Sequence, residues 1–264
     1  MDAEVRMNTA AQITKKPKRE PDPPAIPPLR DGDRMDADEF LRRYAADPVV
    51  YSAELLQSVV HITRRRENHN GKEMIVPPIS AEGHAMPDQR LQGVLFVYAA
   101  QTPGMVGYGP VTVILPSKTT ALEPDAVLRV LPTHGGKSTV GADTFIHGAP
   151  ELLAEISFTS GSRDLGNKFD AYQTDGVREY LVWRTAAQEV QWFVLKRKKY
   201  VALQPDADGT LRSAAFPGLW LDVPALLAGD MAKVLATLQQ GIASPEHTAF
   251  VAKLQKAATK KRKK

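Results

Sequence analysis

The chain of 264 residues contains no cysteine, which excludes disulfide bonds and zinc sites built on thiolates. It also lacks any apolar run near the roughly 18 residues that a membrane-spanning helix needs. Its first residues do not contain the apolar core of a signal peptide. We therefore expect a soluble, cytoplasmic protein that has no membrane partner.

An excess of charge of one sign is also lacking over most of the chain, although the formal net charge is +4. Residues 252–264 hold seven lysines and arginines and no acid, and residues 1–35 have a net charge of +1. Subtracting both leaves −4 for residues 36–251, so the body of the protein is mildly acidic. The basic tail is typical of a solvated chain end, and its alternative role is non-specific binding of phosphates.

Composition divides the chain into three parts. Residues 1–35 are rich in proline and charge and have few large apolar side chains, which predicts a disordered arm. Residues 36–230 carry the apolar patterns of a folded domain. Residues 231–264 indicate a C-terminal helix followed by the basic tail.

The first part of the folded domain combines helical and strand patterns. Apolar residues recur at helical spacing within residues 36–46 and 86–100, so both segments are predicted to be helices. Between them, Asn70 and Gly71 form a strong turn signal that separates two apolar segments. This pattern predicts an N-terminal β-hairpin.

The middle of the chain is dominated by short strand patterns. A helix is predicted at residues 163–174, with Ser160 or Ser162 as its cap and Gly176 at its end. Strands clustered in mid-chain with helices on either side indicate an α/β or α+β fold, in which a mixed sheet is flanked by helices. The hairpin would be an N-terminal extension of this sheet. The predicted strands are 111–115, 126–131, 152–157, 178–183 and 189–196.

Two acidic residues at the predicted strands have unusual surroundings. Glu155 is the only ionised residue of the apolar strand 152–157, where burial without a partner would cost several kcal/mol. A metal or a cation would remove that cost, and the alternative is an edge position or a salt bridge. Asp125 follows Pro124 just before the strand 126–131. A Pro-Asp pair alone is common turn chemistry, so Asp125 gains weight only beside Glu155.

A lysine on the following helix provides the third candidate. Lys168 falls within the apolar stripe of Leu165, Phe169 and Tyr172, and not on the polar side of the predicted helix. A lysine in that position either extends to water or meets an acid on the neighbouring strand, and we favour the acid. Two carboxylates and a lysine suit a divalent metal that activates water against a phosphodiester.

Four segments in this region resemble those of a known family. They are "PDAVLRVLP", "GAPELLAEIS", "RDLGNKFDAYQTDGVREYLVW" and "FPGLWLDVPALL". In order and spacing they are similar to the Uma-two family of restriction-endonuclease-like proteins, which belongs to the PD-(D/E)XK nuclease superfamily. The resemblance covers roughly residues 36–230. It implies a restriction-endonuclease-like core, with a mixed sheet flanked by helices.

The resemblance also implies the residues of the site. Asp125 matches the family's aspartate after proline, and Glu155 matches its glutamate on the next strand. Both would bind the metal, magnesium or manganese. The superfamily lysine usually stands two residues after the glutamate, where this chain has Ser157. Lys168 stands at the place on the next helix to which the family's lysine has moved.

Glu54 and His84 fall near the family's N-terminal glutamate and histidine, so they are auxiliary candidates for binding metal or substrate. We therefore expect a magnesium-dependent endonuclease that hydrolyses DNA phosphodiester bonds. Lys168 would orient the attacking water or help to deprotonate it. Analogy with the superfamily implies a homodimer that cuts both strands. The alternative is an inactive nuclease-fold protein that binds nucleic acid or a protein partner.

Overall fold

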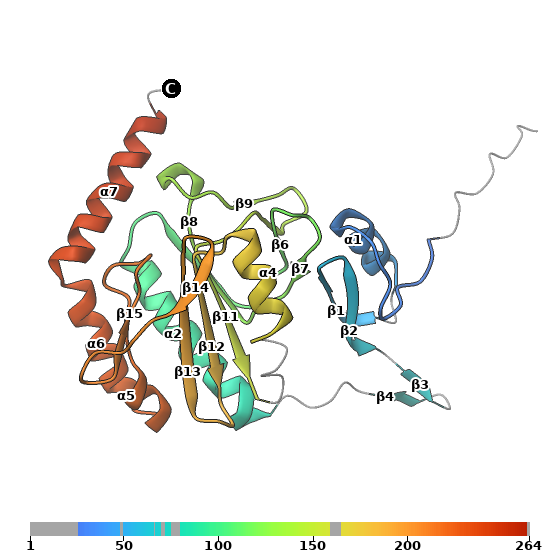
Figure 1. Cartoon of the computed structure of the whole chain (residues 1–264), viewed down its shortest axis with the longest axis horizontal. Helices are drawn as coiled ribbons and strands as arrows, with labels where there is room; N and C mark the ends of the chain where they lie inside the picture. The colour runs from blue at the N-terminus through green and yellow to red at the C-terminus, as the bar shows by residue number, and fades with distance from the viewer. Residues whose placement is uncertain are drawn as a thin grey trace, which may run out of the picture.

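Two six-stranded sheets and the helices around them form the part of the chain that the computed structural model describes (Figure 1). This confirms the predicted mixed α+β fold with helices flanking a sheet. The described residues are 26–47, 50–65, 67–69, 72–74, 80–158 and 165–262.

The central sheet has the strand order β14-β13-β12-β11-β8-β5. Strands β11 and β12 are parallel and the other neighbours are antiparallel, so the sheet is mixed. The chain passes from β11 to β12 through α4 (Asn167–Asp175), as a parallel pair requires a crossover. The strands are β5 (Met105–Tyr108), β8 (Ala126–Val130), β11 (Leu152–Ser157), β12 (Glu179–Arg184), β13 (Glu189–Lys196) and β14 (Lys199–Ala202).

The second sheet has the order β2-β1-β7-β6-β10-β9 and is built mostly from very short strands. A hairpin of β1 and β2 joins its other strands through the pairing of Leu55 with Ala121. This hairpin differs from the predicted one, because both of its strands precede the Asn70-Gly71 turn. The strands are β1 (Val50–Leu56), β2 (Val59–Arg65), β6 (Val113–Ile114), β7 (Ala121–Leu122), β9 (Thr139–Val140) and β10 (Ile146–His147).

The turn of that hairpin was not predicted. It lies at Gln57 and Ser58, which adopt positive φ angles of 51° and 64°. Neither is glycine or asparagine, so the sequence carries no turn signal there. A second, short hairpin of β3 (Glu67–His69) and β4 (Lys72–Met74) flanks the predicted Asn70-Gly71 turn, and those two residues lie outside the described ones.

Helices cover both faces of the central sheet. Strand alternation sends Leu152, Ala154 and Ile156 of β11 into a core beneath α2, α5, α6 and α7, and sends Leu153 to the opposite face beneath α4. Figure 1 shows α5, α6 and α7 at one end of the molecule, and α1 with β1 and β2 at the other. The helices are α1 (Ala37–Ala46), α2 (Met86–Ala100), α5 (Val223–Ala228), α6 (Met231–Ile242) and α7 (Pro245–Arg262).

Smaller elements complete the described fold. A two-stranded sheet of β15 and β16 packs beside α5, and η1, a turn of π-helix, leads directly into α2. The one-turn helix η2 lies against α7. Their bounds are β15 (Thr210–Arg212), β16 (Trp220–Asp222), η1 (Ala81–Ala85) and η2 (Pro132–His134).

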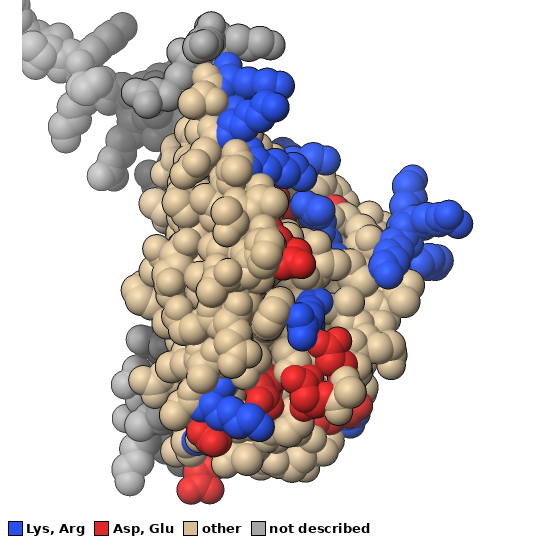
Figure 2. All heavy atoms as spheres, turned by 90° about the vertical axis from the view of Figure 1, so that its left-hand side faces the viewer, with Lys and Arg blue, Asp and Glu red and all other residues tan. Residues whose placement is uncertain are grey.

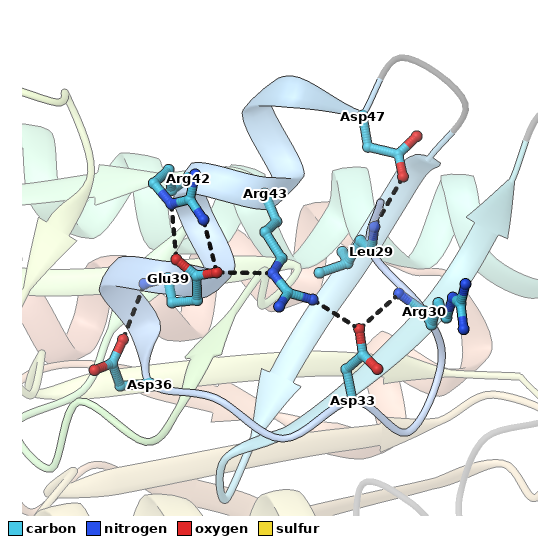
Figure 3. Close-up of polar contacts among 8 residues, drawn as sticks. All are labelled: Leu29, Arg30, Asp33, Asp36, Glu39, Arg42, Arg43 and Asp47. Carbon is cyan, nitrogen blue, oxygen red and sulfur yellow. Dashed lines mark hydrogen bonds and ion pairs between the residues drawn. The ribbon is translucent and has the colours of Figure 1, made fainter. Parts of the chain in front are cut away.

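The two predicted helices of the N-terminal half are confirmed. Helix α2 has the predicted bounds, and α1 begins after Asp36, whose carboxylate accepts a hydrogen bond from the backbone N–H of Glu39. Figure 3 shows that the Glu39 carboxylate in turn accepts hydrogen bonds from the side chains of Arg42 and Arg43. These hydrogen bonds, first of all that from Arg42, lower the pKa of Glu39 to about 2. Asp47 accepts from the backbone N–H of Leu29 just beyond the helix.

Described parts of both predicted terminal segments pack on the folded domain. Residues 1–25 of the predicted arm lie outside the described residues, but Leu29 is fully buried against α1 and the β1–β2 hairpin. At the other end, α7 continues to Arg262, and Leu254 is buried in the first core. The start of the predicted basic tail is therefore a helix packed on the body of the protein.

Helix α4 agrees in part with its prediction. It begins at Asn167, and the proposed caps Ser160 and Ser162 lie outside the described residues. It ends at Gly176, whose φ of 85° is the left-handed conformation expected of a glycine after a helix. Lys168 and Tyr172 are both buried on the face turned to the sheet.

Glu179 is a buried acid that the sequence analysis did not single out. Its side chain accepts four hydrogen bonds, from the backbone N–H groups of Ala214 and Ala215, the hydroxyl of Ser213 and the indole of Trp192. These contacts attach the segment before β16 to the start of β12. We assign Glu179 a structural role, because the cost of its burial is offset by a complete set of donors.

His247 predicts an acid-sensitive step in stability. Its ring packs edge-on against Tyr98 and its Nε2 lies 2.9 Å from the Thr102 hydroxyl, which fastens α7 to α2. Burial lowers the pKa of His247, so the unfolded chain binds a proton more readily than the folded protein. Its contribution to stability is complete above the unfolded pKa of about 6.5 and falls as the pH drops through that value.

We expect His247→Gln to remove this contribution. Denaturant unfolding between pH 5 and 8 should show wild type losing stability on acidification more steeply than the variant, by at most about 1.4 kcal/mol per unit of pH. Parallel curves for the two proteins would contradict the assignment.

Among the described residues, no helix is long and apolar enough to span a membrane.

Candidate active site

Asp125 and Glu155 lie opposite each other at the end of the central sheet. Strands β8 and β11 are antiparallel, and their last registered pair is Ala126 with Ala154. One step further places Asp125 across from Glu155, and directly opposed residues project from the same face. Continuing this register brings the two acids that the sequence singled out to neighbouring positions at the end of β11, with Glu155 on the side that α4 covers.

Asp125 is held by the neighbouring strand and by α2. One of its carboxylate oxygens, Oδ2, accepts a hydrogen bond of 2.6 Å from the backbone N–H of Ile156. Its backbone carbonyl accepts one of 3.3 Å from the Gln92 side chain, which also donates to Asp88 at 2.8 Å. The Asp125 side chain keeps 16% of its surface exposed, so a ligand from solvent can reach it.

His84 reaches the same place from η1. Its Nε2 lies 3.4 Å from Asp125 Oδ1, and its Nδ1 lies 3.1 Å from the carbonyl oxygen of Ile156. Because a carbonyl only accepts, Nδ1 carries a proton. The hydrogen bond with Asp125 raises the pKa of His84, although partial burial opposes this. The imidazole thus carries positive charge more readily than an isolated histidine does.

Lys168 connects Glu155 to the second sheet. Its Nζ is 3.0 Å from Glu155 Oε1 and 3.1 Å from Glu54 Oε1, and all three side chains are at most 7% exposed. The hydroxyl of Tyr172, one turn along α4, donates to Glu155 Oε1 at 2.9 Å. Burial and the adjacent Glu155 carboxylate raise the pKa of Tyr172 well above its usual value, which keeps this donor protonated.

All five residues expected at the site therefore lie in one connected cluster. Lys168, Glu155 and Glu54 come from α4, β11 and β1, and they meet where the two sheets approach each other. Asp125 and His84 complete the cluster through the backbone of Ile156. The sequence reasoning expected an acid beside Lys168, and the structure supplies two.

Three further contributors were not identified from the sequence. The sequence pattern places Tyr172 only in the apolar stripe, yet its hydroxyl donates a hydrogen bond to Glu155. Asp88 and Gln92 form a polar pair in the first turns of α2, behind Asp125. Burial raises the pKa of Asp88, with the Gln92 hydrogen bond opposing. The spacing of four residues between Asp88 and Gln92 was the available signal, because such residues share one helix face.

The donors at this site fit a hard divalent cation. Asp125 Oδ1 and the Ile156 carbonyl oxygen both contact the His84 ring, so two oxygens from different segments of the chain lie close together, next to Glu155 in the sequence. Within the described part of the chain, no group of three or more histidine, aspartate and glutamate side chains has a metal-binding arrangement. Magnesium commonly uses one or two carboxylates and keeps several waters, so two acids and a carbonyl are sufficient.

Comparisons with known proteins agree with this fold. Residues 53–224 match the model of the Uma2 family, described as "Putative restriction endonuclease". A solved structure described as a "putative nuclease belonging to DUF820 from Anabaena variabilis ATCC 29413" is similar with a TM-score of 0.50 and 11% sequence identity. The similarity covers 74% of this chain and 98% of that chain. No curated protein matches the sequence.

The mixed sheet, its flanking helices and the structural match define a restriction-endonuclease-like fold. The family match extends over more than half of the chain and includes Asp125, Glu155 and Lys168. The chain therefore belongs to the Uma2 family, as the sequence resemblance indicated.

Proposed function

We propose that this protein is a metal-dependent endonuclease that hydrolyses DNA phosphodiester bonds at the cluster of Asp125, Glu155 and Lys168. The observation that carries this proposal is the contact of Glu155 with a buried lysine, while the Asp125 carboxylate is hydrogen-bonded to the backbone of the next residue, Ile156. Membership of a family described as "Putative restriction endonuclease" supports it. Nucleases of this kind need hard oxygen ligands and a positive charge close together.

Each residue has a role that follows from its contacts. Asp125 and Glu155, with the Ile156 carbonyl, would hold magnesium or manganese. When bound, the metal would polarise the phosphodiester and lower the pKa of a water. Lys168 is fixed by Glu54 and Glu155, so its ammonium group stays beside the reacting phosphate, where negative charge increases in the transition state. The ammonium group would also orient the attacking water.

Asp125 and Glu155 predict metal dependence that can be measured without cleavage. Titration calorimetry with manganese should show binding to wild type and its loss in Asp125→Asn. The matched control is Asp143→Asn, because Asp143 forms another aspartate–histidine pair, with His147 at 2.8 Å, on the surface. Equal manganese binding by wild type and Asp125→Asn would contradict the assigned ligands.

The same preparations should nick supercoiled plasmid DNA only when magnesium or manganese is present, and EDTA should stop the reaction. Cleavage that continues in EDTA would exclude the proposed chemistry. Absence of both metal binding and cleavage would favour the alternative, an inactive nuclease-fold protein that binds a partner. The homodimer and the cytoplasmic location stay predictions from the sequence.

A further inference from the structure

The hairpin turn between β13 and β14 carries an unusual density of positive charge. Lys196 pairs with Lys199, and Arg197 and Lys198 form the two-residue turn between them. All four side chains are exposed, and we call Lys196–Lys199 the basic turn. Exposed Arg178 lies beside it, because its carbonyl accepts a hydrogen bond of 2.8 Å from the backbone N–H of Leu195. Within the described part of the chain, no ion pair is recorded for these five cations.

The residues of the basic turn do not suit its backbone conformation, so the turn is less stable than an Asn-Gly turn of the same shape. Arg197 and Lys198 have φ angles of 49° and 66°, the left-handed conformation that a tight hairpin turn demands. Asn-Gly suits this turn best, and other residues cost on the order of 1 kcal/mol each there. Lys196 and Lys199 are directly opposed like charges, which also destabilise a hairpin. Residues that break local rules in this way often mark a functional surface.

A second hairpin shows that the turn geometry does not require cations. Gln57 and Ser58 connect β1 to β2 with φ angles of 51° and 64°, almost the same as those of the basic turn. Their flanking pair is Leu56 with Val59. The two turns thus have matching backbones, and only one of them is charged. The four consecutive cations therefore need a separate explanation.

Protection of the sheet edge explains only part of this charge. Strand β14 is at the edge of the central sheet, and lysine on an edge strand discourages pairing with other chains. That argument covers Lys199, which lies on the strand. It does not cover Arg197 and Lys198, which lie beyond the last strand pair.

The distribution of charge indicates a polyanionic partner. Figure 2 views the side of the molecule that carries α5, α6 and α7, and it shows most lysines and arginines in its upper half and most acids in its lower half. Helix α7 also carries the exposed side chains of Lys253, Lys256 and Lys260. Because residues 36–251 carry a net charge of −4, the positive potential is local and not a property of the whole body. A regular polyanion is the complementary ligand.

The sheet register places the basic turn away from the candidate site. Glu155 is in register with Val182, and Val182 with Gln191. Arg197 follows Gln191 by six residues along β13 and its turn, which corresponds to about 20 Å at strand spacing. A DNA strand rises about 3.4 Å per nucleotide along the helix axis, so a duplex bound at the site would span this distance in about six base pairs.

We propose that the basic turn binds the phosphate backbone of the DNA at a distance from the bond that is cut. This proposal rests on the proposed function, since it names where that substrate docks. The contacts are sequence-independent, because Lys and Arg on an exposed turn meet phosphates and not base edges. The strained turn is retained because it projects two cations beyond the end of the sheet.

The test uses a double substitution that should stabilise the protein while weakening binding. Arg197→Asn/Lys198→Gly converts the turn to Asn-Gly, so the denaturant midpoint should rise. Binding of the full chain to a fluorescein-labelled 20-base-pair duplex is measured by anisotropy in EDTA over a series of KCl concentrations. We expect the affinity to fall severalfold, and the slope of log K against log salt to become shallower by about 1 to 2.

The matched control is Gln57→Asn/Ser58→Gly, which relaxes the equivalent uncharged turn. It should stabilise the protein similarly and leave the affinity and the salt slope unchanged. An unchanged slope in the Arg197→Asn/Lys198→Gly variant would overturn the proposal. So would a loss of binding to phosphatidylserine vesicles without any loss for DNA, which would assign the turn to a membrane surface.

Failure of the two proposals can be distinguished, because binding in EDTA needs neither metal nor cleavage. Metal-dependent cleavage with an unchanged salt slope would reject only the docking surface. The expected loss of slope in a protein that never cleaves DNA would reject only the proposed nuclease activity.

Discussion

Asp125→Asn is expected to slow DNA cleavage on the order of a thousandfold, the loss typical of removing a group that acts directly on the transition state. The substitution keeps the size of the side chain but removes the negative charge that a metal ligand needs. One oxygen remains to accept the hydrogen bond from the Ile156 N–H, so the local backbone contact can persist. Initial rates of plasmid nicking in magnesium measure the effect.

Stability should change little in the same variant. The Asp125 side chain is partly exposed, and its partner His84 is 30% exposed, so water can replace the lost interaction. Urea unfolding should therefore show a change of no more than about 1 kcal/mol. A large loss of stability would mean that the missing activity reports unfolding and not chemistry.

Asp88→Asn provides the matched control for Asp125. Asp88 lies in the first turn of α2, is bound to the same Gln92 side chain, and contributes to raising the pKa of His84 through its charge. Its carboxylate accepts a hydrogen bond within its own helix, whereas the Asp125 carboxylate accepts one from the backbone of β11. We expect nicking close to the wild-type rate, and an equal loss in both variants would indicate that general negative charge, and not metal binding by Asp125, supports cleavage.

Local patterns were sufficient for much of the fold. The strands 152–157 and 189–196 and the helix 86–100 have the predicted bounds. In the helix and in the strand 189–196 an apolar period agrees with the face that becomes buried, and the strand 152–157 is buried along its whole length. Sequence and tertiary packing thus favour the same element in each case. The glycine at 176 likewise ends its helix because the left-handed conformation is easy only for glycine.

The parts that the sequence did not reveal depend on distant contacts. Residues 53–66 have a continuous strand pattern, but the chain reverses at Gln57 and Ser58 in a turn that costs strain. The Gln57 N–H and the Ser58 N–H are hydrogen-bonded to Thr120 and Thr119, more than sixty residues away in each case. No local rule predicts a turn that remote residues stabilise.

The candidate site was predictable to a similar extent. Glu155 and Lys168 are site candidates because each is a charged residue within an apolar pattern, and the structure shows that their side chains contact each other. The position of Glu54 could be anticipated only through the family resemblance, since it lies on a different sheet. Spacing along the chain carries no information about such a contact. A buried charge signals that a partner exists, and the fold determines which partner it is.

Lys168→Met should destabilise the folded protein by about 3–5 kcal/mol, the usual cost of removing one member of a buried charged set. Methionine fills similar space, so the loss comes from charge and not from a cavity. Without the ammonium group, Glu54 and Glu155 would face each other at the junction of the two sheets with their shared cation removed. Urea unfolding monitored by circular dichroism measures the difference.

The control is Lys233→Met. Lys233 is also paired with a buried acid, at 3.3 Å from Asp222, but its own side chain is 60% exposed. An exposed pair contributes about 0–1 kcal/mol, so this variant should unfold close to wild type. Similar losses for Lys168→Met and Lys233→Met would show that burial of the lysine is unimportant.

A second substitution tests whether repulsion between the acids causes the loss. Glu54→Gln in the Lys168→Met background removes one of the two carboxylates, so it should recover part of the lost stability, although the same change in wild type should be destabilising. This reversal of sign in a double-mutant cycle arises only when the two residues are energetically coupled. Additive effects would separate Glu54 from Lys168. Activity should not return with stability, because the ammonium group beside Glu155 that the proposed reaction requires would still be missing.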